Sequence, residues 1–201
     1  MSKEIEIEFK SMLTQNGYEK LLHYYNVTNK QFVIQTNLYF DTADFQLKQR
    51  GMGLRIRYFS DTAEATLKIP QTVGLLEVTD RLSLDEVEQA INKDQFTPQA
   101  TEILGQLRTF NISLSDLHLI GKLITKRAEF TIPEGKLALD ESWYSDYHDF
   151  ELELEVPDYN FNEGDFKQLL NKFELPYRKT KNKNCSSCEC AARKNLEMEG
   201  I

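Results

Sequence analysis

Two short segments, near opposite ends of the chain, carry glutamate at every second position. They hold Glu4, Glu6 and Glu8 in the first segment and Glu151, Glu153 and Glu155 in the second. Alternate side chains of a strand share a face, so each segment would present three carboxylates about 7 Å apart. Facing carboxylates at ~5 Å would repel by roughly 3 kcal/mol per pair at an effective dielectric of 20. The pattern therefore indicates bound cations, and carboxylate oxygens without His or Cys suit Mg²⁺ or Mn²⁺.

Arginine and lysine gather on other segments of the chain. These residues are Arg55, Arg57, Lys68, Arg127, Lys179, Lys181 and Lys183. A cluster of such cations suits a polyanion, and metals that bridge carboxylates and phosphate oxygens are common in phosphoryl transfer. For any single strand, the simpler interpretation is a solvated polar face. Two glutamate segments together with several basic ones favour a binding site instead.

Alternating apolar and polar residues predict the strands that would position these groups. Strands are expected over residues 4–10, 31–40, 53–59, 64–69, 75–82, 119–130, 136–140, 143–147 and 150–156. Helices are expected over residues 14–25, 83–92, 97–110 and 161–173, with a turn or short helix at 44–49. Ser83 and Glu86 form a capping-box pattern, and Pro98 is expected at the first position of its helix.

The length and charge of the chain limit the class of protein. Its 201 residues can bury one sizeable core, and no repeat or linker interrupts them, so we expect a single domain over residues 1–201. The formal net charge of −8 argues against general nucleic-acid binding. No apolar run reaches the ~20 residues of a membrane helix, and the charged N-terminus lacks a signal-peptide core. We therefore expect a cytoplasmic protein that associates with no membrane.

The three cysteines lie close together near the C-terminus, at Cys185, Cys188 and Cys190. An odd, clustered set in a cytoplasmic protein is not typical of a disulfide framework. A tetrahedral metal site usually needs four protein ligands, and no fourth ligand is evident nearby. Reduced thiols on a C-terminal tail or helix are the favoured interpretation.

An ordered set of short motifs resembles the CYTH superfamily, also called the triphosphate tunnel metalloenzymes. The segment Glu6-Ile7-Glu8-Phe9-Lys10 resembles the ExExK signature at the start of that family. The later matches, in order, are Tyr39-Phe40-Asp41-Thr42, Leu54-Arg55-Ile56-Arg57, Thr66-Leu67-Lys68, Glu77, Arg127, Asp140 and Glu153-Leu154-Glu155. The resemblance covers nearly the whole chain and is greatest to the small Firmicutes-type members.

This resemblance implies an α+β fold, an eight-stranded antiparallel β-barrel flanked by helices. It implies that one or two divalent metals, Mg²⁺ or Mn²⁺, are held by Glu6, Glu8, Asp140, Glu153 and Glu155. It implies that a triphosphate is gripped by Lys10, Arg55, Arg57, Lys68, Arg127, Lys181 and Lys183. Glu6, Glu8, Lys68 and Arg127 would then act directly in catalysis.

The expected activity is metal-dependent hydrolysis of the terminal phosphate of inorganic tripolyphosphate, thiamine triphosphate or a nucleoside triphosphate. A class IV adenylate cyclase and a polyphosphate- or nucleotide-binding module without turnover are the alternatives. The only partner expected is the small-molecule triphosphate, with the protein a monomer or homodimer. Product analysis with ATP separates the first alternative, and tight tripolyphosphate binding without phosphate release would favour the second.

The chain departs from the family pattern at two positions. Thr125 stands where many members have a lysine, which some are thought to pair with a tyrosine matching Tyr39. Leu75 stands where an arginine is often found before the acidic residue at Glu77. Both departures weigh on turnover more than on binding of the triphosphate.

Overall fold

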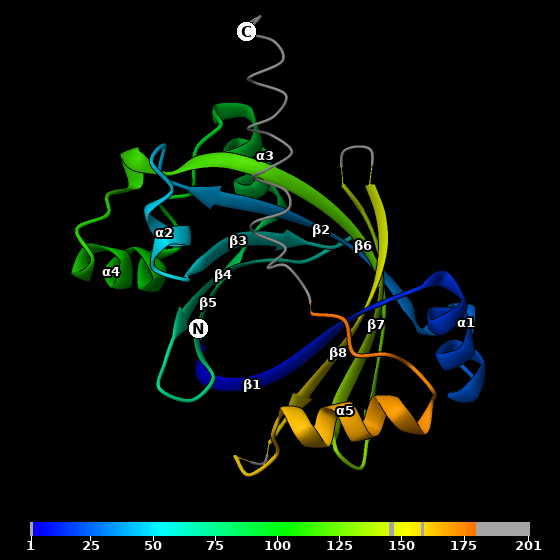
Figure 1. Cartoon of the computed structure of the whole chain (residues 1–201). Coiled ribbons are helices and arrows are strands. Elements are labelled where there is room, and N and C mark those ends of the chain that lie inside the picture. Colours follow the sequence, from blue (N-terminus) through cyan, green and yellow to red (C-terminus); the bar gives the residue numbers. More distant parts are fainter. Residues whose placement is uncertain (1, 145–146, 158, 180–201) are drawn as a thin grey trace, which may run out of the picture. The chain divides into compact units, whose positions relative to one another are not determined.

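The computed structural model describes residues 2–144, 147–157 and 159–179 (Figure 1). Its strands are β1 (Ser2–Leu13), β2 (Phe32–Asp41), β3 (Gly53–Tyr58), β4 (Ala63–Pro70), β5 (Leu75–Leu82), β6 (His118–Ile132), β7 (Gly135–Tyr144) and β8 (Tyr147–Val156). Its α-helices are α1 (Gln15–Tyr24), α2 (Gln46–Gln49), α3 (Leu84–Lys93), α4 (Thr101–Thr109) and α5 (Glu163–Lys172). Short 3₁₀ turns, η1 (Asn29–Gln31) and η2 (Leu114–Asp116), precede β2 and β6.

The strands follow the order β1-β5-β4-β3-β2-β6-β7-β8 and form a closed barrel. The strand pairs whose register is defined are all antiparallel. This confirms the predicted α+β fold with an eight-stranded antiparallel barrel and flanking helices. No helix within the described ranges is long and apolar enough to cross a membrane.

The chain forms two compact units, which are described separately below. Unit 1 contains the described residues within Met1–Ile5 and Gln35–Leu123. Unit 2 contains those within Glu6–Ile34 and Ile124–Lys181. The expectation of a single domain over residues 1–201 stays a prediction.

In unit 1, one face of β3, β4 and β5 is apolar and packs on helices. Leu54, Ile56 and Leu67 on the strands are buried in one cluster with Ile103 and Leu107 of α4. Because side chains alternate along a strand, this burial turns the arginines and the lysine of the same strands to the opposite face.

In unit 2, the apolar residues of β8 alternate with its glutamates and pack against α1 and α5. Leu152 and Leu154 are buried in a cluster with Leu21 of α1 and with Phe166 and Leu170 of α5. The glutamates between them therefore share the other face of β8, as the sequence predicts.

The expected helix over residues 97–110 starts too early. Helix α4 begins at Thr101, so Pro98 does not lie in its first turn. Its first free amide groups are satisfied by β5 instead, because Asp80 Oδ2 accepts hydrogen bonds from the backbone N–H of Glu102 (3.0 Å) and Ile103 (3.1 Å). A cap supplied by a distant strand leaves no local signal in the sequence.

The separate strands expected at 136–140 and 143–147 are also wrong. Strand β7 is continuous from Gly135 to Tyr144, and Tyr147 begins β8. Glu141 and Ser142 interrupt the alternation of the sequence but keep their ladder partners, Phe150 and Asp149 on β8. Ladder hydrogen bonds therefore carry the strand through a polar pair that the pattern treats as a break.

Candidate active site

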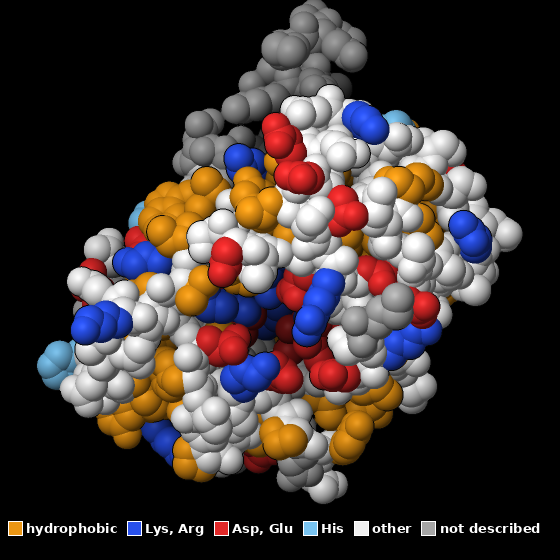
Figure 2. All heavy atoms as spheres, turned by 180° about the vertical axis from the view of Figure 1, so that it is seen from behind, with side chains coloured by type: hydrophobic (Ala, Val, Ile, Leu, Met, Phe, Trp, Pro, Cys, Tyr) orange, Lys and Arg blue, Asp and Glu red, His pale blue; other side chains and the backbone are white. Residues whose placement is uncertain are grey.

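The polar face of unit 2 is an array of charges defined by strand register. Its rows, read from β6 through β7 and β8 to β1, are Thr131–Lys136–Glu155–Glu8, Glu129–Ala138–Glu153–Lys10 and Arg127–Asp140–Glu151–Met12. Residues directly opposite each other in a ladder have Cβ atoms about 4.5–5.5 Å apart. Carboxylates thus outnumber cations on this face, and Figure 2 shows acidic and basic side chains intermingled on the molecular surface.

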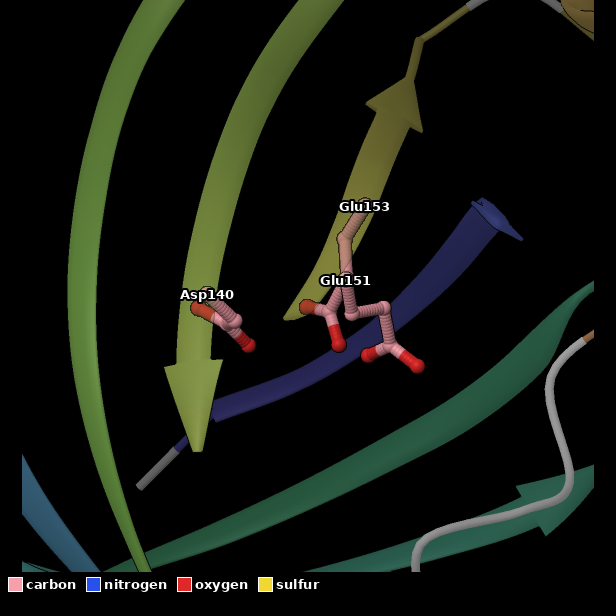
Figure 3. A group of neighbouring side chains, drawn as sticks. All are labelled: Asp140, Glu151 and Glu153. Atoms are coloured by element: carbon pink, nitrogen blue, oxygen red, sulfur yellow. The ribbon is translucent and has the colours of Figure 1, made fainter. Parts of the chain in front are cut away.

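Three carboxylates of this array converge. Asp140 extends from β7, and Glu151 and Glu153 extend from β8, with their carboxylate groups turned towards one another (Figure 3). One oxygen from each lies within 4.8 Å of the others, close enough for the three to share a metal ion. Asp140 and Glu151 are each only 1 % exposed. Buried carboxylates in such a group need compensating positive charge.

Arg127 supplies part of that charge. Its Nε and Nη2 donate to the two oxygens of Asp140, both at 2.7 Å, and Nη2 also donates to Glu153 Oε2 at 2.5 Å. Burial alone would lower the pKa of Arg127, but the charges of Asp140 and Glu153 outweigh burial and raise that pKa well above its ordinary value. Arg127 therefore carries a permanent positive charge and is hydrogen-bonded to two members of the carboxylate trio.

Two lysines neutralise neighbouring glutamates of the same face. Lys10 Nζ lies 3.1 Å from both Glu8 Oε2 and Glu153 Oε1. Lys136 Nζ lies 2.9 Å from Glu155 Oε2, and this hydrogen bond raises the pKa of Lys136. Glu6 lies two residues before Glu8 on β1, on the same side of that strand.

The polar face of unit 1 carries the basic residues predicted from the motifs. Arg57 Nε donates to Asn37 Oδ1 at 3.1 Å, and Nη1 lies 3.8 Å from Glu64 Oε1. Lys68 Nζ lies 3.2 Å from Glu77 Oε2 on the neighbouring strand. Each of these cations is held in place by a polar side chain from an adjacent strand.

Two buried donors on this face lack hydrogen-bond partners among the residues that the structure describes. They are Arg55 Nε on β3 and the hydroxyl of Thr66 on β4, which are opposite each other in the ladder. Thr66 itself is fully buried. An unsatisfied buried donor costs about 1–3 kcal/mol, so such a pair indicates a place for an acceptor that the described residues do not supply.

The two departures from the family pattern have clear local settings. Thr125 is buried and its hydroxyl shares a 3.0 Å hydrogen bond with Ser142 across β6 and β7. Leu75 begins β5, opposite Pro70 at the end of β4. A matched threonine–serine pair thus satisfies the polar groups at the position where a lysine is expected.

Asp41 is a helix cap. Its carboxylate accepts hydrogen bonds from the backbone N–H of Thr42 (2.8 Å), Leu47 (2.9 Å) and Lys48 (3.0 Å), and so begins α2. Tyr39 is buried on β2 opposite Arg55. Lys181, Lys183 and the three cysteines lie outside the described residues.

Two residues of these faces were not among the site residues that the family resemblance implies. Glu151 belongs to the carboxylate trio and was grouped with Glu153 and Glu155 by alternation alone. Thr66 lies on β4 directly opposite Arg55 of β3 and Thr79 of β5. The alternation of the sequence could have identified both, because Glu151 points to the same face of its strand as Glu153, and Thr66 points to the same face as Lys68.

The donors of the trio fit a hard divalent cation. All three are carboxylates, the ligands that Mg²⁺, Ca²⁺ and Mn²⁺ prefer, and no histidine or cysteine is among them. The structure thus supports a site for a divalent metal without selecting one ion.

Comparison with known proteins agrees with the motifs and the fold. A CYTH domain family model matches residues 4–184. The Bacillus subtilis (strain 168) protein named "Putative triphosphatase YjbK" is 39% identical over 183 residues, which cover 91% of this chain and 94% of that protein.

Solved structures share the fold of this chain. A Bacillus halodurans protein, described as a "putative adenylate cyclase", is 36% identical, with a TM-score of 0.84 over 91% of this chain and 97% of its own. The Hippeastrum protein HpAC1, described as a "putative adenylyl cyclase" that reveals a dominant triphosphatase activity, is 19% identical, with a TM-score of 0.71 over 92% of this chain and 96% of its own. The match over residues 4–184, together with the closed barrel, shows that the chain belongs to the CYTH domain family.

Proposed function

We propose that this protein is a divalent-metal-dependent triphosphatase that hydrolyses the terminal phosphate of a triphosphate. The observation that carries the proposal is the carboxylate trio of Asp140, Glu151 and Glu153 beside Arg127. Its occurrence in a CYTH chain 39% identical to a protein named as a triphosphatase supports hydrolysis. Inorganic tripolyphosphate, thiamine triphosphate and nucleoside triphosphates are the candidate substrates.

We assign the metal to the acidic face of unit 2, with Mg²⁺ or Mn²⁺ as the ion. Asp140, Glu151 and Glu153 would hold it, and Glu6, Glu8 and Glu155 are the further ligands that the family resemblance implies. When bound, such an ion withdraws charge from phosphate oxygens and lowers the pKa of a bound water.

The side chains of unit 2 then bind and orient the substrate. Arg127 would donate to phosphate oxygens through its planar fork, and Lys10 would neutralise charge near Glu8 and Glu153. Glu6 or Glu8 would accept a proton from the attacking water. Catalysis in this proposal rests mostly on positioning and electrostatics, as is general for phosphoryl transfer.

The cations of unit 1 are assigned to the phosphate groups as well. Arg55, Arg57 and Lys68 are the predicted ligands, with Lys68 also predicted to act in catalysis. The buried, unsatisfied donors of Arg55 and Thr66 support this role, because phosphate oxygens would satisfy both. Lys181 and Lys183, which lie outside the described residues, remain predicted ligands.

A substrate panel tests the proposed function. Tripolyphosphate, thiamine triphosphate, ATP and GTP are each incubated with the protein in Mg²⁺ and in Mn²⁺, and released orthophosphate is measured. The proposal predicts metal-dependent phosphate release from at least one of them. Tight binding of tripolyphosphate without release from any substrate would support the binding module instead.

An adenylate cyclase is the second candidate, because the Bacillus halodurans relative is described by that name. Both activities use the same triphosphate, but they differ in products. Chromatography of the ATP reaction gives ADP and orthophosphate for a triphosphatase, and cyclic AMP and pyrophosphate for a cyclase. The cytoplasmic location and the monomeric or dimeric state stay predictions, and light scattering tests the latter.

A further inference from the structure

Arg127 is hydrogen-bonded to two of the three carboxylates that could hold a metal ion. Its Nη2 bridges Asp140 Oδ2 at 2.7 Å and Glu153 Oε2 at 2.5 Å, and both residues belong to the carboxylate trio. Its Nε holds the other oxygen of Asp140 at 2.7 Å. One cation thus engages two of the three groups that a divalent ion would use.

Arg127 and a metal ion require different spacings of these oxygens. Mg²⁺ binds carboxylate oxygens at about 2.0–2.1 Å in near-octahedral geometry, so its ligands must lie closer together than those around a nitrogen donor. The three oxygens of the trio lie within 4.8 Å of one another. A guanidinium at the same oxygens would also repel the incoming dication. Arg127 and a divalent metal would therefore compete for the oxygens of Asp140 and Glu153.

The register explains how Arg127 reaches both carboxylates. Asp140 is directly opposite Arg127, whereas Glu153 lies one row away, across Ala138 of β7. Ala138 is buried and its methyl group leaves the diagonal between Arg127 and Glu153 open. A larger side chain at that position would separate the two.

We propose that Arg127 is a resident counter-cation that a divalent metal displaces from Asp140 and Glu153, and that its release makes the guanidinium available to the triphosphate. The inference rests on the proposed function and adds an order of events to it. In the metal-free protein Arg127 compensates the trio, and after displacement it compensates phosphate. Metal binding and triphosphate binding are then coupled through one side chain, and such coupling must be reciprocal.

Metal titration of the metal-free protein is the first test. Isothermal calorimetry with Mn²⁺ alone compares wild type with Arg127→Gln, and Lys126→Gln serves as the matched control because it removes the neighbouring positive charge on β6, whose partner Glu141 is not assigned to the metal. The proposal predicts that Arg127→Gln binds Mn²⁺ about 5–150-fold more tightly than wild type, the usual range of coupling between sites. Lys126→Gln should show a much smaller gain. Equal or weaker Mn²⁺ binding by Arg127→Gln overturns the inference, and so does an equal gain in the control.

A second variant covers the case in which Arg127→Gln does not fold. Arg127→Lys keeps the charge but loses the two-pronged contact with Asp140, so its Mn²⁺ affinity should exceed that of wild type. An affinity of Arg127→Lys at or below that of wild type would contradict a competing arginine.

The other half of the coupling is measured without metal. In EDTA, Asp140→Asn removes the main partner of Arg127 and should bind tripolyphosphate more tightly than Glu155→Gln, which removes the same charge from the same face. Equal tripolyphosphate affinities in the two variants would show a general charge effect and would overturn the release of Arg127.

The outcome is separable from that of the proposed function. If wild type hydrolyses no triphosphate but Arg127→Gln binds Mn²⁺ more tightly, the triphosphatase proposal is wrong and the counter-cation proposal is supported. If wild type hydrolyses its substrate but Arg127→Gln gains no Mn²⁺ affinity, the counter-cation proposal is wrong and the triphosphatase proposal is supported.

Discussion

Among individual residues, the balance of charge on the face of unit 2 is set by a few close pairs. Arg127 with Asp140 and Lys10 with Glu8 and Glu153 compensate carboxylates that would otherwise repel one another. Charged groups this close interact strongly when they are partly buried, since solvent screens them less. Among the strand residues that the structure describes, carboxylates still outnumber cations on this face, which suits the proposed divalent ion.

Glu151 lies outside the motifs that match the family, and its substitution gives the first prediction. Glu151→Gln keeps the size of a side chain that is 1 % exposed but removes one ligand charge from the trio. We expect activity to fall about 10–100-fold, with the metal dependence moved to higher concentrations. Phosphate release measured across a Mn²⁺ titration checks this.

Glu129→Gln is the control for that prediction. Glu129 lies on the same face of β6 and its side chain is 44% exposed, outside the trio. Its loss should change the Mn²⁺ requirement much less. Equal effects of the two variants would mean that overall charge, and not ligation by Glu151, controls the metal.

Thr66 gives a prediction for unit 1. Thr66→Val keeps the branched shape on β4 and removes the buried hydroxyl that has no partner in the described part of the chain. If that hydroxyl donates to phosphate, KM should rise several-fold, because a lost hydrogen bond costs about 0.5–1.5 kcal/mol of binding free energy. The free energy of unfolding should not fall. An unchanged KM together with a raised free energy of unfolding would show that the Thr66 hydroxyl does not contact the substrate.

At the scale of elements, the hairpin between β6 and β7 fixes the register of the acidic rows. Gly135 opens β7, and a Cβ atom at this position would lie 2.1 Å from the backbone oxygen of Glu155. Because β8 approaches this closely, only glycine fits without a backbone shift.

Gly135→Ala should therefore displace β8 and its glutamates. We expect a loss of about 1–3 kcal/mol in the free energy of unfolding, the usual cost of overpacking, together with weaker Mn²⁺ binding. Urea unfolding and metal titration measure the two effects. A variant as stable as wild type, with unchanged metal affinity, would show that the contact between β7 and β8 is not constrained in this way.

The cap that β5 supplies to α4 gives a prediction for the apolar side of unit 1. Asp80→Ala removes the acceptor for the N–H groups of Glu102 and Ile103 and should cost about 1–2 kcal/mol of stability. Triphosphatase kcat should be retained, because Asp80 is on the face of β5 that packs against α4. Loss of activity at unchanged stability would contradict a purely structural role.

Alternation in the sequence predicted most of this architecture. It located the strands and the faces on which Glu153, Arg55 and Lys68 lie, because apolar residues between them had to be buried. It could not predict which residue lies opposite which, so the contact of Arg127 with both Asp140 and Glu153 was not foreseeable. Nor could it predict that Asp80 caps α4, because that hydrogen bond joins residues 22 and 23 positions apart.

At the scale of the whole molecule, a metal that binds only the folded chain must stabilise it. At 100 times its dissociation constant such a ligand contributes about 2.7 kcal/mol, or an increase of about 5–10 °C in Tm for a chain of this size. Differential scanning calorimetry with Mn²⁺ and with EDTA measures this increase. An unchanged Tm at saturating Mn²⁺ would argue against a metal site in the native fold.

The most direct test of metal-dependent hydrolysis at the carboxylate trio is orthophosphate release from tripolyphosphate by the metal-stripped protein, before and after Mn²⁺ is added back. The double variant Glu151→Gln, Glu153→Gln is assayed beside wild type, because it removes two of the three carboxylates of the trio. We expect no release without metal, restored release by wild type in Mn²⁺, and little release by the double variant at any Mn²⁺ concentration. Hydrolysis by wild type in EDTA, or full activity of the double variant, would contradict a metal-dependent reaction at these carboxylates.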